Sequence, residues 1–238
     1  MDLYQELKNN AYPGRGILLG WSQKGDYGVA LYFIMGRSEN SRNRVFALQE
    51  GALYAKAFDE SKVTDPSLIL YAPLKLWKQD LILTNGDQTD TIIQGLQENR
   101  SFFDSLQSRC FEPDAPHFTP RISGIFHFGP HPSYALSILK SNEGDPGECL
   151  RFLYTYDTPK AGEGHFIHTY QRDAQGNAPL ESFSGEPKKV SVPEDMEAFG
   201  KQVWESLNPE NKISLYLRYT HLQTMEYKEY LVNERENS

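Results

Sequence analysis

Strand-forming segments follow one another directly along most of this chain. Apolar stretches at residues 15–22 and 27–35 flank Gln-Lys-Gly-Asp, a sequence suited to a hairpin turn. Further strands are predicted at residues 45–49, 52–58, 68–71, 80–84, 121–128, 133–140, 150–156, 165–171 and 213–219. Strands that come in runs, rather than alternating with helices, favour antiparallel sheets with helices on the outside. The sequence therefore predicts an α+β fold, with residues 1–238 forming one domain.

Helical spacing is confined to three segments. Residues 1–10 form a short lead-in, and residues 194–207 carry apolar side chains at helical intervals. A third helical segment spans residues 90–110, with a joint near Asn99 and with Asp87 or Thr89 as its N-cap. Residues 112–120 contain three prolines and are predicted to be irregular, residues 36–44 to be a loop, and residues 173–187 to be rich in turns.

Composition excludes several classes of protein. The net charge of −8 disfavours nucleic-acid binding, although clustered arginines still allow a small anionic substrate. Two isolated cysteines argue against a disulfide framework or a thiolate zinc site. The first ten residues are too polar for a signal peptide, and no apolar run reaches the roughly 20 residues that span a bilayer. We therefore expect a cytoplasmic protein without a membrane segment, and the sequence leaves a homo-oligomer open.

Arginines are densest at residues 36–44, which read Gly-Arg-Ser-Glu-Asn-Ser-Arg-Asn-Arg. Guanidinium groups bind phosphate oxygens in pairs of hydrogen bonds, and hydroxyls and amides complete such a site. The loop is a candidate phosphate site, and the alternative is a solvated hairpin tip. Its candidate residues are Arg37, Ser38, Arg42 and Arg44.

Residues 84–91 join a predicted strand to a predicted helix. Asn85-Gly86 permits a left-handed turn, and the free N–H groups of the helix point back at this loop, where they favour an anion. Asp87 and Asp90 would repel a phosphate, so the alternatives are helix capping or a bond to a substrate hydroxyl or amide.

A third candidate segment, residues 118–124, follows a loop that contains Glu112, Asp114 and His117. Arg121 opens an otherwise apolar strand, where a charge usually has a partner or ligand. An arginine at a strand end that reaches water is the alternative.

The histidines predict no metal site. His165 and His168 lie three residues apart on a predicted strand and therefore face opposite sides. Metalloprotease, phosphate-loop and dinucleotide-binding motifs are missing from the sequence.

These segments together resemble the archaeal-type IMP cyclohydrolase family. The resemblance rests on the arginine loop, on Asn85-Gly86-x-x-Thr89-Asp90-Thr91-Ile92 and on Thr119-Pro120-Arg121-Ile122, in matching order and approximate spacing. Tyr12-x-Gly14-Arg15 and Tyr71 are also similar to this family, and residues 165–171 and 179–187 look like its longer bacterial branch.

The resemblance implies a four-layer αββα sandwich of mainly antiparallel sheets, similar to the N-terminal nucleophile hydrolases. No Cys, Ser or Thr stands at the head of the first matching strand, which disfavours self-processing amide hydrolysis. The implied reaction closes the ring of 5-formamidoimidazole-4-carboxamide ribotide to IMP with loss of water, and it needs no cofactor or metal.

The reaction assigns roles to the candidate residues. The phosphate or ribose would be bound by Arg37, Ser38, Arg42 and Arg44. The base and its carboxamide would be held by Asn85, Gly86, Asp87 and Thr89, and Asp90 and Thr119 join the substrate-binding set. Arg121 and Tyr71 would polarise the formyl oxygen or move protons, and the general base is left open among Glu112, Asp114 and His117.

Two other functions remain open from sequence. One is a cyclohydrolase or amidohydrolase that acts on another ribotide or on an N-acyl substrate. The other is a non-catalytic nucleotide-binding domain, which would bind IMP without turning over its precursor.

Overall fold

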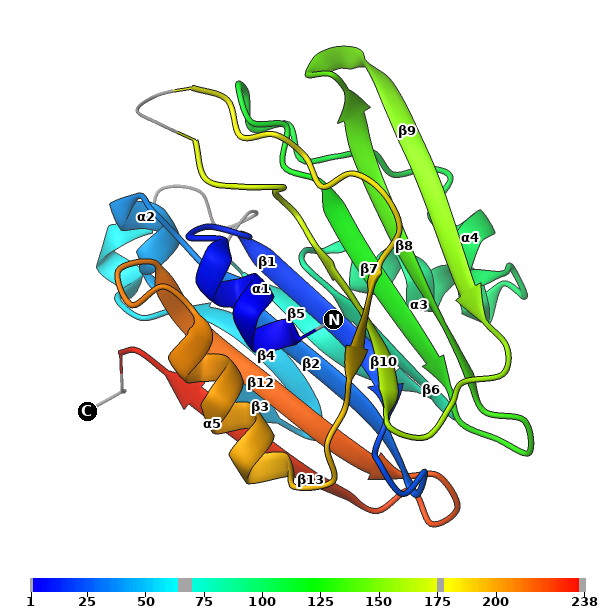
Figure 1. The fold of residues 1–238 in the computed structure, drawn as a ribbon. Helices are drawn as coiled ribbons and strands as arrows, with labels where there is room; N and C mark the ends of the chain where they lie inside the picture. The colour runs from blue at the N-terminus through cyan, green and yellow to red at the C-terminus, as the bar shows by residue number, and fades with distance from the viewer. Residues whose placement is uncertain (1, 64–69, 175–177, 236–238) are drawn as a thin grey trace.

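Two antiparallel sheets lie face to face in the computed structural model, which describes residues 2–63, 70–174 and 178–235 (Figure 1). Over these residues the first sheet has six strands, in the spatial order β11 (Lys188–Ser191), β10 (Glu163–His168), β1 (Arg15–Trp21), β2 (Tyr27–Met35), β12 (Lys212–His221) and β13 (Tyr227–Asn233). The second has seven, in the order β3 (Arg44–Gln49), β4 (Ala52–Ala57), β5 (Tyr71–Trp77), β6 (Asp80–Thr84), β7 (Arg121–His127), β8 (Ser133–Asn142) and β9 (Asp145–Tyr156). The predicted α+β class with mainly antiparallel sheets is confirmed.

Tight turns explain why consecutive strands pair. Glu50 and Gly51, between β3 and β4, both have positive φ angles of 51° and 76°. Glu143 and Gly144, between β8 and β9, have φ angles of 50° and 83°. Two consecutive left-handed residues match the right-handed twist of the flanking strands, so both connections favour hairpins.

Alternation along the strands divides the apolar residues among three cores. Ile17 and Leu19 of β1 join the core between the sheets, whereas Leu18 joins the core beneath α1 (Leu3–Asn9) and α5 (Met196–Ser206). A third core lies on the other face of the seven-stranded sheet, under α3 (Gln88–Gln97) and α4 (Phe102–Ser105). Helices therefore cover the outer faces of both sheets (Figure 1).

Most of the expected elements form within a few residues of their predicted bounds. The joint in the third helical segment is confirmed, because α3 and α4 are separated by Asn99 with a φ angle of 60°. Asp87 occupies the N-cap position of α3, but its side chain makes no capping bond. Among the described residues, no helix is long and apolar enough to cross a bilayer.

Several predicted bounds were wrong. The loop at residues 36–44 contains a helical turn, α2 (Glu39–Arg42), because Ser38 and Ser41 bond reciprocally to each other's backbone N–H groups. The strand expected at 68–71 has residues 68 and 69 outside the described part, and β5 runs from Tyr71 to Trp77. The strand predicted to begin at residue 150 starts at Asp145. The edge strands β11 and β13 were not predicted, and a short 3₁₀ turn, η1 (Glu60–Lys62), follows β4.

Candidate functional site

Several strands begin with a polar side chain, and four of these side chains belong to the candidate site. They are Arg15 of β1, Arg44 of β3, Tyr71 of β5 and Arg121 of β7. Strands β3, β5 and β7 run in the same direction, because each is separated from the next by one antiparallel strand. The first residues of these three strands therefore lie at the same end of the seven-stranded sheet, where the strands begin. Arg15 interacts electrostatically with Tyr71 and Arg44, so β1 contributes from the facing sheet.

Arg15 and Arg44 are guanidinium groups with unused donors. Arg44 is 2% exposed, and its Nε donates to the Ser41 carbonyl over 2.8 Å. The buried Nη2 of Arg44 and the buried Nε of Arg15 have no hydrogen-bond partner within the described ranges, and neither arginine forms an ion pair there. Buried donors of this kind normally have an acceptor, which makes this end of the sheet suited to an anion.

The pKa values of the two arginines shift in opposite directions. Burial, followed by the nearby charge of Arg15, lowers the pKa of Arg44. Burial also acts to lower the pKa of Arg15, but the Glu112 carboxylate and the neighbouring tyrosines raise it above its usual value. Glu112 is thus the anion that balances Arg15.

Glu112 is a buried carboxyl at the centre of the cluster. It is 5% exposed, and its backbone N–H bonds to the Thr119 carbonyl over 2.9 Å. Burial raises the pKa of Glu112, although Arg15 and Arg121 act to lower it. A Cβ atom on Gly86 would lie 3.6 Å from Glu112 Oε1 and 2.7 Å from Arg121 Nη1. Glycine at position 86 therefore makes room for both groups.

Tyrosines line the same region. The Tyr32 and Tyr71 hydroxyls lie 2.8 Å apart. Tyr12 stacks on Tyr170 with ring centroids 5.8 Å apart, and the Arg37 guanidinium lies 4.9 Å from the centre of the Tyr12 ring. These rings combine an apolar wall with polar tips, as a site for a planar heterocycle requires.

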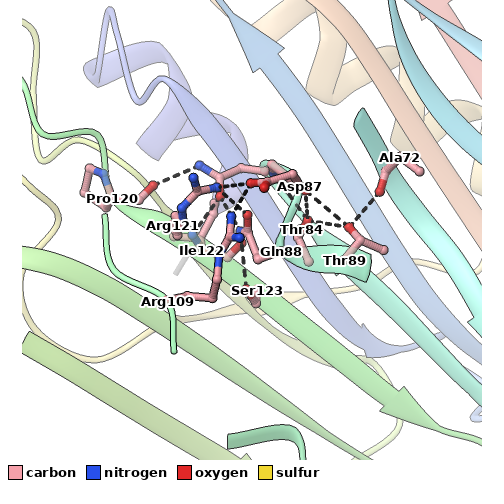
Figure 2. Close-up of polar contacts among 12 residues, drawn as sticks. Ala72, Thr84, Asp87, Gln88, Thr89, Arg109, Pro120, Arg121, Ile122 and Ser123 are labelled. Atoms are coloured by element: carbon pink, nitrogen blue, oxygen red, sulfur yellow. Dashed lines mark hydrogen bonds and ion pairs between the residues drawn. The ribbon is translucent and has the colours of Figure 1, made fainter. Parts of the chain in front are cut away.

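The strand-to-helix turn predicted to bind substrate is occupied by its own hydrogen bonds (Figure 2). Asn85 Oδ1 accepts from the Ile122 N–H and from Gln88 Nε2, each over 2.9 Å, and Asn85 Nδ2 donates to the Pro120 carbonyl. Thr89 Oγ1 donates to the Ala72 carbonyl over 2.6 Å. These side chains join the turn to β7 and to β5.

Asp87 fixes the position of Arg121. Its Oδ1 accepts from Arg121 Nη1 over 2.8 Å and also from Arg109 Nη2, while Gln88 Oε1 accepts from Arg121 Nη1 over 2.8 Å (Figure 2). Burial acts to raise the pKa of Asp87, but the bonds from Arg109 and Arg121 hold it below its usual value. Asp90 is further away, where it is exposed and pairs with Lys75 over 2.6 Å.

The three candidates for the general base lie in different surroundings. Asp114 Oδ1 accepts from the Thr119 N–H over 2.7 Å, and its other oxygen accepts from the Thr119 hydroxyl. His117 accepts a bond from the Leu180 N–H over 3.3 Å and lines a separate cavity of about 510 Å³. The Glu112 carboxylate accepts no hydrogen bond from any of the described residues, so its oxygens are available to a ligand.

The four predicted phosphate ligands of the arginine loop have different partners and do not form one site. Arg37 pairs with Asp173 over 2.9 Å and reaches the cluster only through the Tyr12 ring. Ser38 caps α2. Arg42 donates to the Gly36 carbonyl over 3.1 Å and lines another cavity. Among the described residues, Arg44 is the one of the four predicted phosphate ligands that interacts electrostatically with both Arg15 and Tyr71.

Sequence reasoning missed several members of the cluster, namely Tyr12, Arg15, Tyr32 and Tyr170. An arginine that opens an apolar strand was the signal used for Arg121, and Arg15 carries the same signal. Tyr12 belongs to a segment that resembles the family, although no role was assigned to it. Tyr32 and Tyr170 fall in segments predicted to be strands, where a tyrosine is usually part of the core. Among the described residues, no group of three or more His, Cys, Asp or Glu side chains is placed to hold a metal ion.

Comparisons with known proteins show the family of this chain. The model of the family described as IMP cyclohydrolase-like protein matches residues 12–224. The IMP cyclohydrolase of Methanopyrus kandleri is 33% identical over 167 residues, which cover 69% of this chain and 77% of that protein. The match takes in Tyr12, Arg15 and every candidate side chain described above, and the chain belongs to the IMP cyclohydrolase-like family.

Proposed function

We propose that this chain is an IMP cyclohydrolase, which closes 5-formamidoimidazole-4-carboxamide ribotide to IMP in purine biosynthesis. The observation that carries the proposal is the cluster of buried Arg44, Arg121 and Glu112 with half-buried Arg15, in a chain of this family. A phosphorylated substrate needs a cationic site, and a ring closure needs a base and a cation beside the developing oxyanion.

The reaction has two stages. The carboxamide nitrogen first attacks the formyl carbon, loses a proton and leaves a carbinolamine hydroxyl on that carbon. The carbon–oxygen bond then breaks, the hydroxyl leaves as water, and the formamide nitrogen loses a proton. Each stage removes one proton from nitrogen and delivers one to oxygen, so no cofactor is consumed.

The geometry suggests how the residues divide this work. Arg44, with its unused Nη2, would bind the phosphate. Arg15, Arg121 and Tyr71 would polarise the formyl oxygen, and Glu112 would take the proton from the carboxamide nitrogen. Asn85, Gly86, Asp87 and Thr89 would act by holding Arg121 and leaving it space, since their side-chain groups are already bonded or absent.

We further propose a single-domain, cytoplasmic protein with the four-layer αββα arrangement of the N-terminal nucleophile hydrolases. The family match across residues 12–224 and the core shared by both sheets support one domain. Helices over both outer faces support the four layers.

The test is formation of IMP from the formylated carboxamide ribotide, followed by absorbance. We expect the wild type to exceed the spontaneous rate and Glu112→Gln to lower kcat by about 10²–10⁴-fold, the usual contribution of a general base. Glu98→Gln is the matched control, because Glu98 is exposed and bonds only to Arg100 and Gln94 among the described side chains. It should leave the rate unchanged.

The pH dependence gives a second readout. A base works in its ionised form, and burial raises the pKa of Glu112, so kcat should rise with pH through a limb above the usual glutamate range near 4.3. Glu112→Gln should lack this limb. A wild type that binds IMP but forms none above background would reject the enzyme and favour a binding domain.

A further inference from the structure

A chain of three hydroxyl and carboxyl groups leads out of the cluster. The Tyr170 hydroxyl lies 2.5 Å from Thr119 Oγ1, and the Thr119 hydroxyl also bonds to Asp114 Oδ2. Tyr170 is 2% exposed and Thr119 1% exposed, whereas Asp114 is half-buried. The three hydrogen-bonded groups therefore lead from the interior toward the surface.

Chemistry fixes the direction of these bonds. An ionised aspartate only accepts, so the Thr119 hydroxyl must donate its one proton to Asp114. The Thr119 oxygen then accepts, which makes Tyr170 the donor. Both protons point toward Asp114, and a proton that reaches the Tyr170 oxygen from a bound substrate can be passed on without rotation of any group.

The inner end of the chain lies in the candidate site. The Tyr170 ring stacks on Tyr12, and Tyr170 interacts electrostatically with Arg15. Burial raises the pKa of Tyr170, so a free phenolate is disfavoured and its proton must move together with that of Thr119.

We propose that Tyr170, Thr119 and Asp114 form a proton relay for ring closure. This inference rests on the proposed function. Glu112 serves the carboxamide nitrogen in the first stage, and the relay serves the formamide nitrogen in the second. As the formamide proton leaves for the Tyr170 oxygen, the phenol proton passes to Thr119 and the Thr119 proton to Asp114. The reverse sequence returns one proton to the departing hydroxyl, which leaves as water, so the relay ends as it began.

The test compares Thr119→Val with Thr220→Val. Both changes remove a buried hydroxyl that forms a hydrogen bond, but Thr220 bonds to Arg218 and lies at the end of β12 that pairs with Gly28, remote from Arg15. We expect Thr119→Val to lower kcat at least tenfold with KM changed less than twofold, and Thr220→Val to leave both unchanged. Thr119→Ser keeps the hydroxyl and should recover most of the lost kcat.

Solvent isotope measurements separate a relay from a structural role. A relay moves several protons in one step, so kcat measured across mixtures of H₂O and D₂O should follow a curve in the wild type and in Thr119→Ser. It should follow a straight line in Thr119→Val. Unfolding temperatures and the affinity for IMP, measured on each variant, show whether the fold and pocket survive.

The outcomes are distinct. A wild type without turnover overturns the proposed function and the relay together. An active wild type whose Thr119→Val variant keeps kcat within twofold, or loses kcat while the isotope curve keeps its shape, overturns the relay alone.

Discussion

At the scale of single residues, burial distinguishes side chains that the sequence treats as equivalent. Arg37, Arg42 and Arg44 fall within eight residues of one another and share one motif. Arg42 donates to the Gly36 carbonyl and to Asn211 Oδ1, whereas the buried Nη2 of Arg44 has no hydrogen-bond partner in the described part of the chain. A buried guanidinium nitrogen without an acceptor among the described residues is the better candidate for a ligand's phosphate.

Arg44→Met and Arg42→Met test this difference. If Arg44 binds the phosphate, its replacement should remove most of the preference for IMP over inosine, at least a tenfold change in the ratio of the two Kd values. Arg42→Met should change that ratio less than threefold. Calorimetric titration measures the Kd values of IMP and inosine. Equal effects of the two variants would indicate that the arginine loop as a whole binds the phosphate.

At the scale of elements, one amide holds the strand-to-helix turn in place. Asn85 is 1% exposed and bonds to the Ile122 N–H and the Pro120 carbonyl, both in the segment that opens β7. The same turn carries Asp87 and Gln88, which hold Arg121 (Figure 2). The turn and the strand thus position the arginine jointly.

Asn85→Ala leaves two buried backbone groups without partners. Each such group costs about 1–3 kcal/mol, so the free energy of unfolding should fall by roughly 2–6 kcal/mol. Asp90→Ala, on the same turn, removes an exposed ion pair with Lys75 and should cost less than about 1 kcal/mol. Urea denaturation measures both, and similar losses in the two variants would contradict the role given to Asn85.

At the scale of the whole molecule, the two sheets bring residues that are distant in the sequence together, at the end where β1, β3, β5 and β7 begin. Arg15 and Tyr170 come from the six-stranded side, and Arg44, Tyr71 and Arg121 from the seven-stranded side. Stability of this stack depends on buried groups that must stay neutral.

His168 is the clearest of these groups. It is fully buried and stacks on Phe166 with ring centroids 5.2 Å apart. His165, on the opposite face as predicted, lies 2.8 Å from the Tyr134 hydroxyl.

Stability should therefore fall in acid. Burial and then Lys188 lower the pKa of His168 from 6.5 to about 3. The unfolded chain takes up this proton near pH 6.5 and the folded chain does not, so the stabilisation present above pH 6.5 is lost as the pH falls toward 3. Between pH 6.5 and 5 the loss should be about 2 kcal/mol, from 1.36 kcal/mol per pKa unit.

His168→Gln removes this proton uptake. Its free energy of unfolding should fall less steeply between pH 6.5 and 5 than that of the wild type, by about the same 2 kcal/mol. Urea denaturation at several pH values measures the slopes, and parallel curves would show that His168 does not control the acid sensitivity.

The sequence by itself determined the fold class, most of the strands and the family motifs, because alternation, turn residues and helix spacing are local properties of the chain. It also placed Arg44, Arg121 and Glu112 among the candidate residues. It did not distinguish Arg42 from Arg44, or Glu112 from Asp114 and His117, because burial and hydrogen-bond partners come from segments far away in the chain.

Only the tertiary structure decided that Arg15, Tyr32 and Tyr170 join the cluster, and that Asn85 and Thr89 are bonded to neighbouring strands. The physical reason is that strand direction and sheet stacking set which residues meet. A charged or phenolic side chain acquires its chemistry from the groups around it once water is removed.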